Sequence, residues 1–393
     1  MYKLKTLDNF DLKDFEGDVF QIDNKTNPDG IIVRSSKVPD ELINDKTLFI
    51  ARSGVGVNTI NIKKATENGT VVFNTPGANS NAVKELALQC LFRSVRPLDN
   101  AFQATKELTS TNLLPAAESI RKDFVGSELY GKSVGVLGLG TIGQRFAEAC
   151  YHLGMQVFGY ARSFKDLKYV QQLEKIEEIL EVADFVVIFL PSTAETFHLL
   201  NEKALEKMKP NAVVMNFGRD EIVDNQAILK ALNENKISKY VTDFPNKNLQ
   251  NNSKVIMLPH LGGNTNEALE HSANLTLQSM LRFLETGNIR RSVNFPSLEL
   301  PFNSAQRISL YFKSNIEIFN FLSGFLFSGK IPIQEMAVNT RGDYGYQLIN
   351  TDLTKLSETE VENMIVKLQT VPGMVRVRLI DNPSPMAEKH FEK

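Results

Sequence analysis

The chain has 393 residues, enough for about two or three domains that each bury a core. Its 44 Lys and Arg residues nearly balance 46 Asp and Glu residues, and the formal net charge of -2 favours neither nucleic acid nor an anionic membrane as a partner. Two cysteines are too few for a disulfide framework, and the start, MYKLKTLDNFDLKDF, lacks the apolar region of a signal peptide. We therefore expect a cytoplasmic protein, and we predict no metal site.

Apolar, strand-like runs alternate with helix-like patterns in the first part of the chain. The runs cover residues 30–33, 48–51 and 71–74, and a long helical pattern follows at 81–95. Alternation of this kind is typical of parallel α/β units. The sequence therefore predicts a parallel sheet here.

A glycine-rich turn separates a strand-like run from a helical pattern in the stretch VGVLGLGTIGQRFA. Gly138, Gly140 and Gly143 have the spacing of a dinucleotide-binding turn. The first glycine permits the tight turn, and the second lets backbone N–H groups, including those of Thr141 and Ile142, approach a pyrophosphate. The third allows close packing of helix on strand. We predict that this turn binds a dinucleotide.

The next strand, residues 156–160, lacks the acidic residue that normally binds the ribose of NAD in such folds. Ala161, Arg162 and Ser163 follow it instead. Ala161 cannot hydrogen-bond the ribose hydroxyls, and the missing Asp also removes the repulsion that excludes the 2′-phosphate of NADP. Arg162 and Ser163 could attract that phosphate. These residues alone leave the choice between NAD and NADP open.

Four more apolar strands complete a doubly wound sheet, at residues 185–190, 212–216, 240–243 and 255–258. Ligands bind beyond the carboxyl ends of such strands, which makes polar residues directly after them candidates. Arg219 follows one strand, where a guanidinium could hold a carboxylate; the alternative is a surface arginine. His260 follows another strand, between a proline and two glycines. It alone of the five histidines lies in a strand-end loop, which favours a general acid/base over a structural histidine.

Two earlier loops carry weaker signals. Arg52 follows the strand at 48–51, and the N–H groups of Ser53 and Gly54 behind it could form an anion nest; the alternative is a glycine-rich turn with a solvated arginine. Asn79 and Ser80 precede the helical pattern and are cap candidates. Taken alone, they indicate only a capped helix.

From Ser292 onward the stretch SVNFPSLELP is interrupted by prolines and has no periodicity, which is typical of a linker. The patterns beyond it follow the βαββαβ order of a ferredoxin-like domain. The predicted elements are residues 307–312, 315–328, 331–338, 344–351, 358–370 and 374–380.

These stretches, in this order, resemble the D-isomer-specific 2-hydroxyacid dehydrogenases. The C-terminal unit resembles the single ACT domain of the short D-3-phosphoglycerate dehydrogenases among them. The resemblance is carried by GIIVRSSKV, ARSGVGVNTINIKKATENGTVVFNTPGANSNAVKEL, GKSVGVLGLGTIGQRFA, PHLGGNTNEA and SVNFPSLELP. It implies a Rossmann-type nucleotide-binding domain (94–275) inserted in a flavodoxin-like substrate domain (1–93 and 276–300), and a ferredoxin-like, ACT-like regulatory domain (304–382).

The resemblance implies oxidation of 3-phosphoglycerate to 3-phosphohydroxypyruvate with hydride transfer to NAD, the first step of serine biosynthesis. NADP remains possible as the cofactor. The alternatives are another D-2-hydroxyacid dehydrogenase or reductase, acting on hydroxypyruvate, glyoxylate or a longer phosphorylated acid, and a non-catalytic, nucleotide-sensing binding module. A homodimer or homotetramer is also expected.

The resemblance also assigns roles to residues. His260 would be the acid/base, and Arg219 would orient the substrate carboxylate and carbonyl. Arg52 is the best candidate for the substrate phosphate. The other implied substrate-binding residues are Ser53, Gly54 and Asn79. Asp243 matches the aspartate that contacts the nicotinamide carboxamide. The other implied cofactor-binding residues are Gly138, Gly140, Thr141, Ile142, Gly143, Ala161, Arg162, Pro191 and Gly262.

The chain departs from the family pattern in two places. The family motif DVFxxEP contains a Glu that pairs with the catalytic histidine, whereas TDFPNKNL places Lys247 there. A cation beside His260 would favour the neutral base; alternatively Lys247 carries the proton itself, holds the phosphate or is a solvated loop lysine.

The second departure concerns the effector site of the serine-inhibited enzymes. FKSNIEIF places Phe312 and Ser314 where a HxNRPGVL-like stretch presents effector-binding His and Asn, and Pro332 replaces a second Asn. We expect insensitivity to L-serine, because an amino acid would leave its charges unpaired there.

Overall fold

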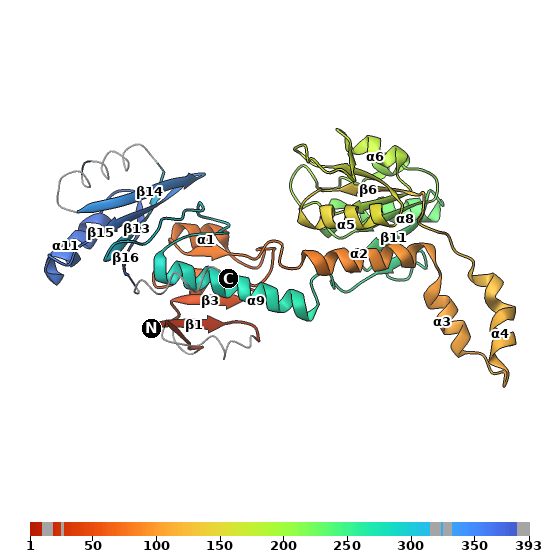
Figure 1. Ribbon diagram of the computed structural model, residues 1–393, viewed down its shortest axis with the longest axis horizontal. Coiled ribbons are helices and arrows are strands. Elements are labelled where there is room, and N and C mark those ends of the chain that lie inside the picture. Colours follow the sequence, from red (N-terminus) through yellow and green to blue (C-terminus); the bar gives the residue numbers. More distant parts are fainter. Residues whose placement is uncertain (10–18, 25–26, 315–323, 325–331, 383–393) are drawn as a thin grey trace. The chain divides into compact units, whose positions relative to one another are not determined.

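The computed structural model describes all residues except 10–18, 25–26, 315–323, 325–331 and 383–393 (Figure 1). Its contacts divide the chain into two compact units. The first comprises Met1–Ala78 and Leu269–Lys393, and the second comprises Asn79–Ala268. The helix α2 (Ser80–Val95), which the predicted boundary at residue 93 divides, lies wholly in the second unit.

The first unit contains a five-stranded parallel sheet in the order β2-β1-β3-β4-β5. Its strands are β1 (Tyr2–Thr6), β2 (Phe20–Ile22), β3 (Gly30–Val33), β4 (Phe49–Arg52) and β5 (Val71–Phe73). One core cluster joins these strands to α1 (Ile62–Glu67), and another joins them to α9 (Asn266–Thr286). The sequence predicted β3, β4 and β5 but missed β1 and β2. In β1 apolar residues alternate with lysines, and β2 has only 3 residues.

The second unit contains a seven-stranded sheet in the order β12-β11-β10-β9-β6-β7-β8, again parallel throughout. Its strands are β6 (Ser133–Leu137), β7 (Gln156–Tyr160), β8 (Gln171–Gln172), β9 (Phe185–Ile188), β10 (Ala212–Asn216), β11 (Ile237–Thr242) and β12 (Val255–Met257). The strand order reverses between β6 and β9, which is where doubly wound sheets bind their ligands. The predicted doubly wound α/β fold is confirmed.

Helices cover both faces of this sheet (Figure 1). Apolar residues of α2 and of α5 (Thr141–His152) form one core with the strands. Residues of α6 (Ile176–Val182), α7 (Glu202–Glu206) and α8 (Asn225–Asn233) form the core on the opposite face. Burial on both faces explains why the strands read as continuous apolar runs.

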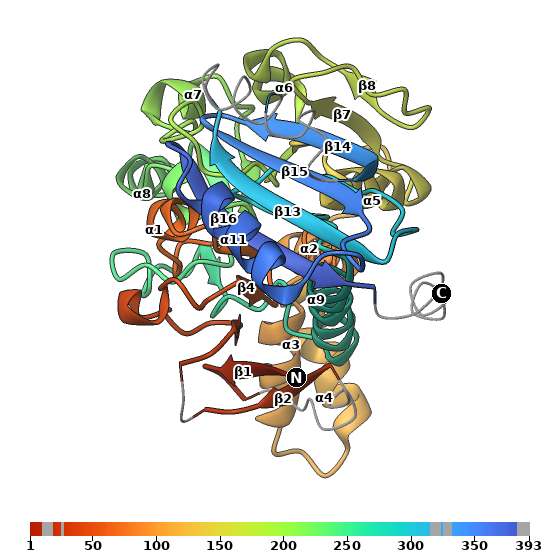
Figure 2. The ribbon, with the colours of Figure 1, turned by 90° about the vertical axis from the view of Figure 1, so that its left-hand side faces the viewer.

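The C-terminal part of the first unit is a four-stranded antiparallel sheet in the order β14-β15-β13-β16. Its elements are β13 (Gln306–Lys313), β14 (Ile333–Arg341), β15 (Tyr344–Thr351), α11 (Glu358–Gln369) and β16 (Met374–Asp381). Figure 2 shows α11 lying across this sheet, where Met364 and Leu368 pack on Ile308 and Leu310. The four predicted strands and the second helix are confirmed. The predicted helix at 315–328 lies outside the described residues, apart from residue 324.

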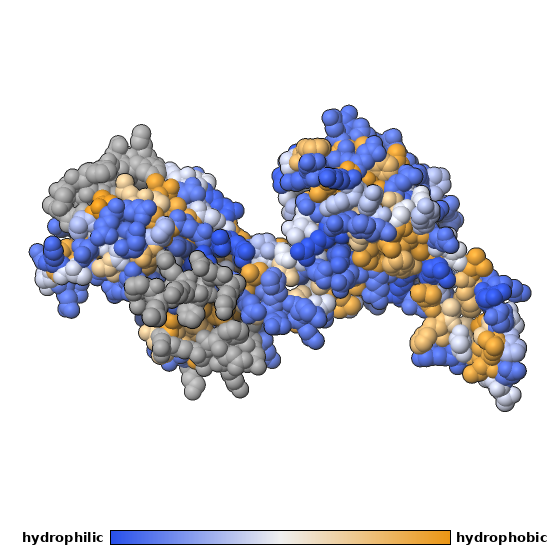
Figure 3. Space-filling model, viewed as in Figure 1, coloured by the Kyte–Doolittle hydropathy of each residue, from blue (hydrophilic) through white to orange (hydrophobic). Residues whose placement is uncertain are grey.

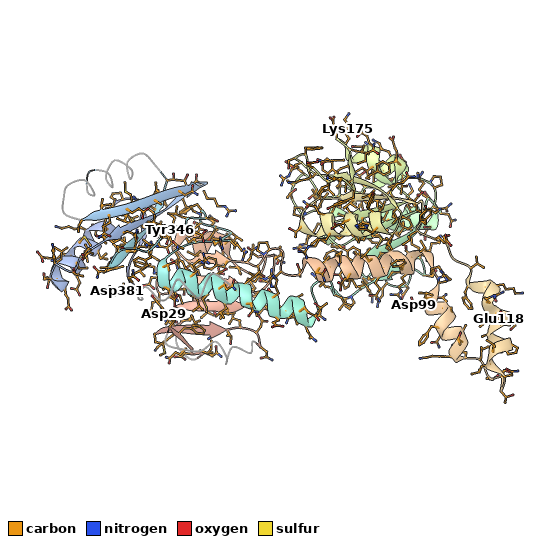
Figure 4. The ribbon with its side chains drawn as sticks, in the orientation of Figure 1. Asp29, Asp99, Glu118, Lys175, Tyr346 and Asp381 are labelled. Atoms are coloured by element: carbon orange, nitrogen blue, oxygen red, sulfur yellow. The ribbon has the colours of Figure 1, made fainter. Side chains whose placement is uncertain are left out.

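The other face of this sheet lies against the rest of the first unit. Arg307 is fully buried and donates to the carbonyl oxygens of Thr286, at the end of α9, and of Leu300, in the linker. The Tyr346 hydroxyl donates to the Gly287 carbonyl at 2.5 Å (Figure 4). The sheet therefore shares one apolar core with the five-stranded sheet and α9.

Two helices that the sequence did not predict, α3 (Leu98–Lys106) and α4 (Leu113–Ile120), leave apolar side chains exposed. Leu98, Phe102, Leu113 and Leu114 are 57% to 73% exposed, and apolar surface gathers over these helices in Figure 3. Among the described helices, none is both long and apolar enough to span a membrane.

Candidate functional site

The carboxyl edge of the seven-stranded sheet collects most of the predicted site residues. Because all of its strands are parallel, the loops after β6, β7, β9, β10, β11 and β12 leave from the same edge. These loops carry the glycine turn, Ala161, Pro191, Arg219, Asp243 and His260. The described residues include no cluster of three or more His, Cys, Asp or Glu side chains that could hold a metal ion.

The glycine turn after β6 has the geometry that a pyrophosphate needs. Gly138 has φ 105°, and a Cβ on Gly143 would lie 1.9 Å from the Gly138 carbonyl oxygen, so both positions require glycine. Gly140 caps α5 without a side-chain hydrogen bond, and a Cβ there would meet no described atom within 4 Å. The first N–H groups of α5, including those of Thr141 and Ile142, thus face open space. This cradle fits a dinucleotide pyrophosphate.

The loop after β7 is fixed by a neutral side chain. Gln172 of β8 donates to the carbonyl oxygens of Ala161 at 3.3 Å and Ser163 at 3.1 Å. Its Oε1 accepts from the N–H of Lys165 at 2.8 Å. Arg162 and Ser163 are exposed, as a cofactor phosphate would require.

A cavity of about 620 Å³ lies beyond the carboxyl ends of β7 and β8. Its lining is mixed: Tyr160, Ile176, Phe197 and Leu199 contribute apolar surface, and charged residues, among them Lys175 at the start of α6 (Figure 4), contribute the rest. A planar ring with polar edges fits such a lining. The cavity could not be predicted from local sequence, because its lining comes from the end of β7, from α6 and from the segment that leads into α7.

Arg219 is held by a buried amide in the turn after β10. Asn216 is fully buried, its Nδ2 donates to the Arg219 carbonyl at 2.9 Å, and its Oδ1 accepts from the N–H of Gly218 at 3.0 Å. The Arg219 guanidinium donates to the Gly218 carbonyl at 2.6 Å and is half-buried. Most of its donors remain available for a carboxylate.

His260 is exposed after β12 and has a left-handed backbone, with φ 59°. That conformation costs a non-glycine residue about 1–2 kcal/mol. The N–H groups of Leu261 and Gly262 donate to the Asp243 carboxylate at 2.6 Å and 2.8 Å. Burial raises the pKa of Asp243, and these two hydrogen bonds oppose that rise.

Lys247 is exposed in the turn after β11. Its side chain makes no hydrogen bond or ion pair with any other residue that the structure describes. No contact between Lys247 and His260 therefore supports the prediction that Lys247 takes the place of the family Glu.

The remaining predicted residues lie mostly in the first unit. The Arg52 Nε donates to the Arg34 carbonyl at 3.1 Å, and the Ser53 hydroxyl donates to Ser272 at 2.9 Å. The N–H groups of Ser53 and Gly54, expected to form an anion nest, donate to the carbonyls of Val33 and Arg52.

Asn79 is in the second unit, at the start of α2. A Cβ on Gly263 would lie 2.9 Å from its Nδ2. Its neighbour Ser80 is 1% exposed, and the hydroxyl of Ser80 has no hydrogen-bond partner among the described residues. The start of α2 thus lies against the loop that carries His260.

A family model described as "D-isomer specific 2-hydroxyacid dehydrogenase, NAD binding domain" matches residues 90–262. The chain is 32% identical over 283 residues to a D-3-phosphoglycerate dehydrogenase of Methanocaldococcus jannaschii, a match covering 69% of this chain and 52% of that one. It is 31% identical over 273 residues to a glyoxylate reductase of Thermococcus gammatolerans, covering 64% and 78%. The chain thus spans about half the length of the D-3-phosphoglycerate dehydrogenases that it matches.

Among solved structures, a D-isomer specific 2-hydroxyacid dehydrogenase of Lactobacillus delbrueckii ssp. bulgaricus, in an NAD complexed form, has the same fold. The TM-score is 0.61 at 20% identity, over 74% of this chain and 100% of that one.

Proposed function

Because this chain belongs to the D-isomer specific 2-hydroxyacid dehydrogenase family, we propose that it transfers a hydride between a D-2-hydroxy acid and a nicotinamide cofactor. The observation that carries the proposal is the placement of an uncapped glycine turn, Arg219 and His260 at one edge of the seven-stranded sheet. A dinucleotide cradle, a carboxylate-binding cation and an acid/base are the three parts that this reaction needs.

In the direction of oxidation, His260 removes the hydroxyl proton as the C2–O bond becomes a carbonyl. A dinucleotide held by the turn at Gly138, Gly140 and Gly143 would supply the nicotinamide ring that takes up the hydride from C2. Arg219 holds the carboxylate and draws electron density toward the forming carbonyl oxygen. In the reverse direction, His260 donates the proton to that oxygen.

We propose 3-phosphoglycerate as the substrate and 3-phosphohydroxypyruvate as the product. The relatives named D-3-phosphoglycerate dehydrogenase and the C-terminal antiparallel sheet, which we assign to an ACT-like domain, support this choice. Arg52, the half-buried last residue of β4, is the proposed phosphate ligand. Glyoxylate reduction is the second candidate, because this chain covers more of the relatives with that name.

We propose NAD as the cofactor, with weak discrimination against NADP. The adenine ring would occupy the cavity walled by Tyr160, Ile176 and Phe197. No carboxylate occurs at residues 161–163 to select the ribose diol or repel a 2′-phosphate.

We propose that a second copy of this chain covers the apolar surface of α3 and α4. Four large apolar side chains exposed on two short helices form a patch of the kind that marks an interface. Sedimentation of the wild type and of Phe102→Glu with Leu114→Glu tests this proposal. We expect dissociation in the double variant and none in Val366→Glu, a change at an exposed apolar residue of α11. A monomeric wild type would contradict the proposal.

The C-terminal domain is proposed to be insensitive to L-serine. Phe312 is fully buried in the core under α11 and offers no polar group, and the Pro332 carbonyl accepts from the Thr351 hydroxyl. Initial rates should not change up to about 10 mM L-serine, the range of a weak site. Saturable inhibition would contradict this.

The deciding experiment is a steady-state assay of 3-phosphoglycerate, phosphohydroxypyruvate, hydroxypyruvate and glyoxylate, each with both nicotinamide cofactors. We expect the highest kcat/KM with the phosphorylated pair. A higher value with glyoxylate would select the reductase. Binding of NADH without turnover of any of these acids would favour a nucleotide-sensing module and contradict the enzyme.

A further inference from the structure

The contacts around His260 point to a second function for a neighbouring carboxylate. We propose that Asp243 is a positioning residue whose carboxylate fixes the backbone that carries His260. This inference rests on the proposed function, since it concerns the acid/base of that reaction. It is an alternative to the carboxamide contact that the family resemblance implies, because both carboxylate oxygens accept from the chain itself.

The Asp243 carboxylate is engaged by the chain itself. The residue is 3% exposed, Oδ1 accepts from the N–H of Leu261 at 2.6 Å, and Oδ2 accepts from the N–H of Gly262 at 2.8 Å. Each oxygen thus holds one of the two amides that directly follow His260. Hydrogen bonds from N–H to an ionised carboxylate are among the strongest in proteins.

The conformation of His260 explains why such an anchor is needed. Its φ of 59° is one that an L-residue keeps only when the surroundings impose it. A left-handed residue turns the N–H groups that follow it toward one point, where an anion can accept both. Asp243 supplies that anion, and the same two hydrogen bonds set the direction in which the imidazole leaves the backbone.

The loop that follows His260 is also closely packed at its two glycines. A Cβ on Gly262 would lie 2.9 Å from the Asp243 Oδ2 and 3.3 Å from Val83 of α2, and one on Gly263 would lie 2.9 Å from the Asn79 Nδ2. The two glycines therefore allow the loop to enter between the end of β11 and the start of α2. The Phe244 ring meets the His260 ring edge-on, with centroids 5.3 Å apart.

The replacement of the family Glu by Lys247 leaves His260 without the usual side-chain partner. In the family pattern a Glu pairs with the catalytic histidine, and Lys247 occupies that place in this sequence. The Asp243 contacts hold the loop through its backbone and not through the imidazole. This chain can therefore orient His260 without the usual pair.

Three variants test the inference. Asp243→Asn keeps the shape but leaves one acceptor for two N–H groups, and Gly262→Ala brings a methyl group within 2.9 Å of the Asp243 Oδ2, which displaces the carboxylate. Asp224→Asn is the matched control, because Asp224 also accepts two backbone N–H groups, from Gln226 at 3.0 Å and Ala227 at 3.2 Å, at the start of α8. Gly262→Ala carries the test if Asp243→Asn does not fold.

We expect Asp243→Asn and Gly262→Ala to lower kcat about 10- to 100-fold, the scale of a misplaced catalytic group, with the Kd for NADH within about twofold of wild type. Asp224→Asn should retain kcat within about twofold, because a lost cap acts on stability and not on the site. Amide exchange of residues 261–262 should accelerate at least about tenfold in Asp243→Asn and in Gly262→Ala but not in Asp224→Asn, since hydrogen bonding to the carboxylate protects these groups.

Unchanged exchange at 261–262 would overturn the anchor, whether or not the protein is an enzyme. Loss of kcat matched by an equal rise in the Kd for NADH would reassign Asp243 to the cofactor. A wild type without turnover would sink the proposed function, and the exchange experiment would then still decide whether the carboxylate holds the loop.

Discussion

The ends of β7 and β11 lie at the same edge of one sheet, and they use side-chain oxygens in opposite ways. After β7 there is no acidic residue, and Gln172 fixes an exposed loop through both ends of its amide. After β11 the acidic residue Asp243 is buried, and each of its carboxylate oxygens accepts a hydrogen bond from a backbone N–H group. No acid occurs after β7, where the ribose of a bound dinucleotide would lie, and one occurs after β11, where it accepts from the two N–H groups that follow His260.

The amide of Gln172 and the carboxylate of Asp243 fix their loops by different hydrogen-bonding chemistry. A neutral amide can organise a loop as a donor and an acceptor at once, which leaves the surface free for either ribose or phosphate. A carboxylate only accepts, so it suits the place where two N–H groups converge. We therefore expect cofactor choice to respond to changes at the β7 end and turnover to respond to changes at the β11 end.

The largest expected effect lies at His260, which follows β12 in the loop that Asp243 at the β11 end holds. His260→Asn should lower kcat by about 10² to 10⁴, the usual contribution of a general acid/base. The Kd for NADH, measured by fluorescence titration, should change little, because the cradle at Gly138–Gly143 is separate. An unchanged kcat would show that His260 is not the acid/base. It would also contradict the expectation that turnover depends on the loop held at the β11 end.

The next largest effect tests the missing acid after β7. Ala161→Asp should raise the KM for NADP at least about tenfold and leave that for NAD equal or lower, because a carboxylate accepts from the ribose hydroxyls and repels a 2′-phosphate. Ala161→Asn is the matched control, which adds a hydrogen-bonding group without the repulsion. A wild type that already favours NAD by more than about 10³, or about 4 kcal/mol, would contradict weak discrimination.

A smaller effect is expected for the neutral anchor. Gln172→Leu removes three hydrogen bonds from the loop after β7 and should raise the KM for both cofactors about threefold, because neutral hydrogen bonds at an exposed loop contribute little net free energy. Gln226→Leu, at an exposed position on α8, is the control. A kcat loss as large as that of Asp243→Asn would erase the distinction between the two anchors.

Much of this arrangement could be predicted from local sequence. Strands such as Phe185–Ile188 are buried on both faces and read as apolar runs, and the spacing of Gly138, Gly140 and Gly143 reflects close contacts that only glycine allows. Because parallel strands end at one edge, the positions of Arg219 and His260 followed from their place after strands. These features could be predicted because each depends on a short segment or on the rule that parallel strands end at one edge of a sheet.

The parts that could not be predicted depend on contacts between distant segments. The anchor joins Asp243 to residues 18 and 19 positions away, and the bond from Gln172 to Ala161 spans 11. The helices α3 and α4 are amphipathic but have only 9 and 8 residues and bury none of them, so they lack the long apolar pattern that marks a core helix. The anchor and the Gln172 contact leave no periodic signal in the sequence.

The smallest expected effect concerns Lys247, which the family pattern places beside the catalytic histidine. Its side chain is exposed and makes no hydrogen bond or ion pair with another described residue, and a solvated ammonium contributes little to a proton transfer that it does not contact. We therefore expect Lys247→Met to retain kcat and KM within about twofold, while Asp243→Asn does not, since exposed charges usually change rates little. A drop of about tenfold or more in Lys247→Met, restored by Lys247→Arg, would return Lys247 to the site as a cation that acts on His260 or on the substrate phosphate. In that case the loop after β11 would carry two functional residues. Asp243 would hold the backbone at His260, and Lys247 would place a positive charge beside His260 or the substrate phosphate.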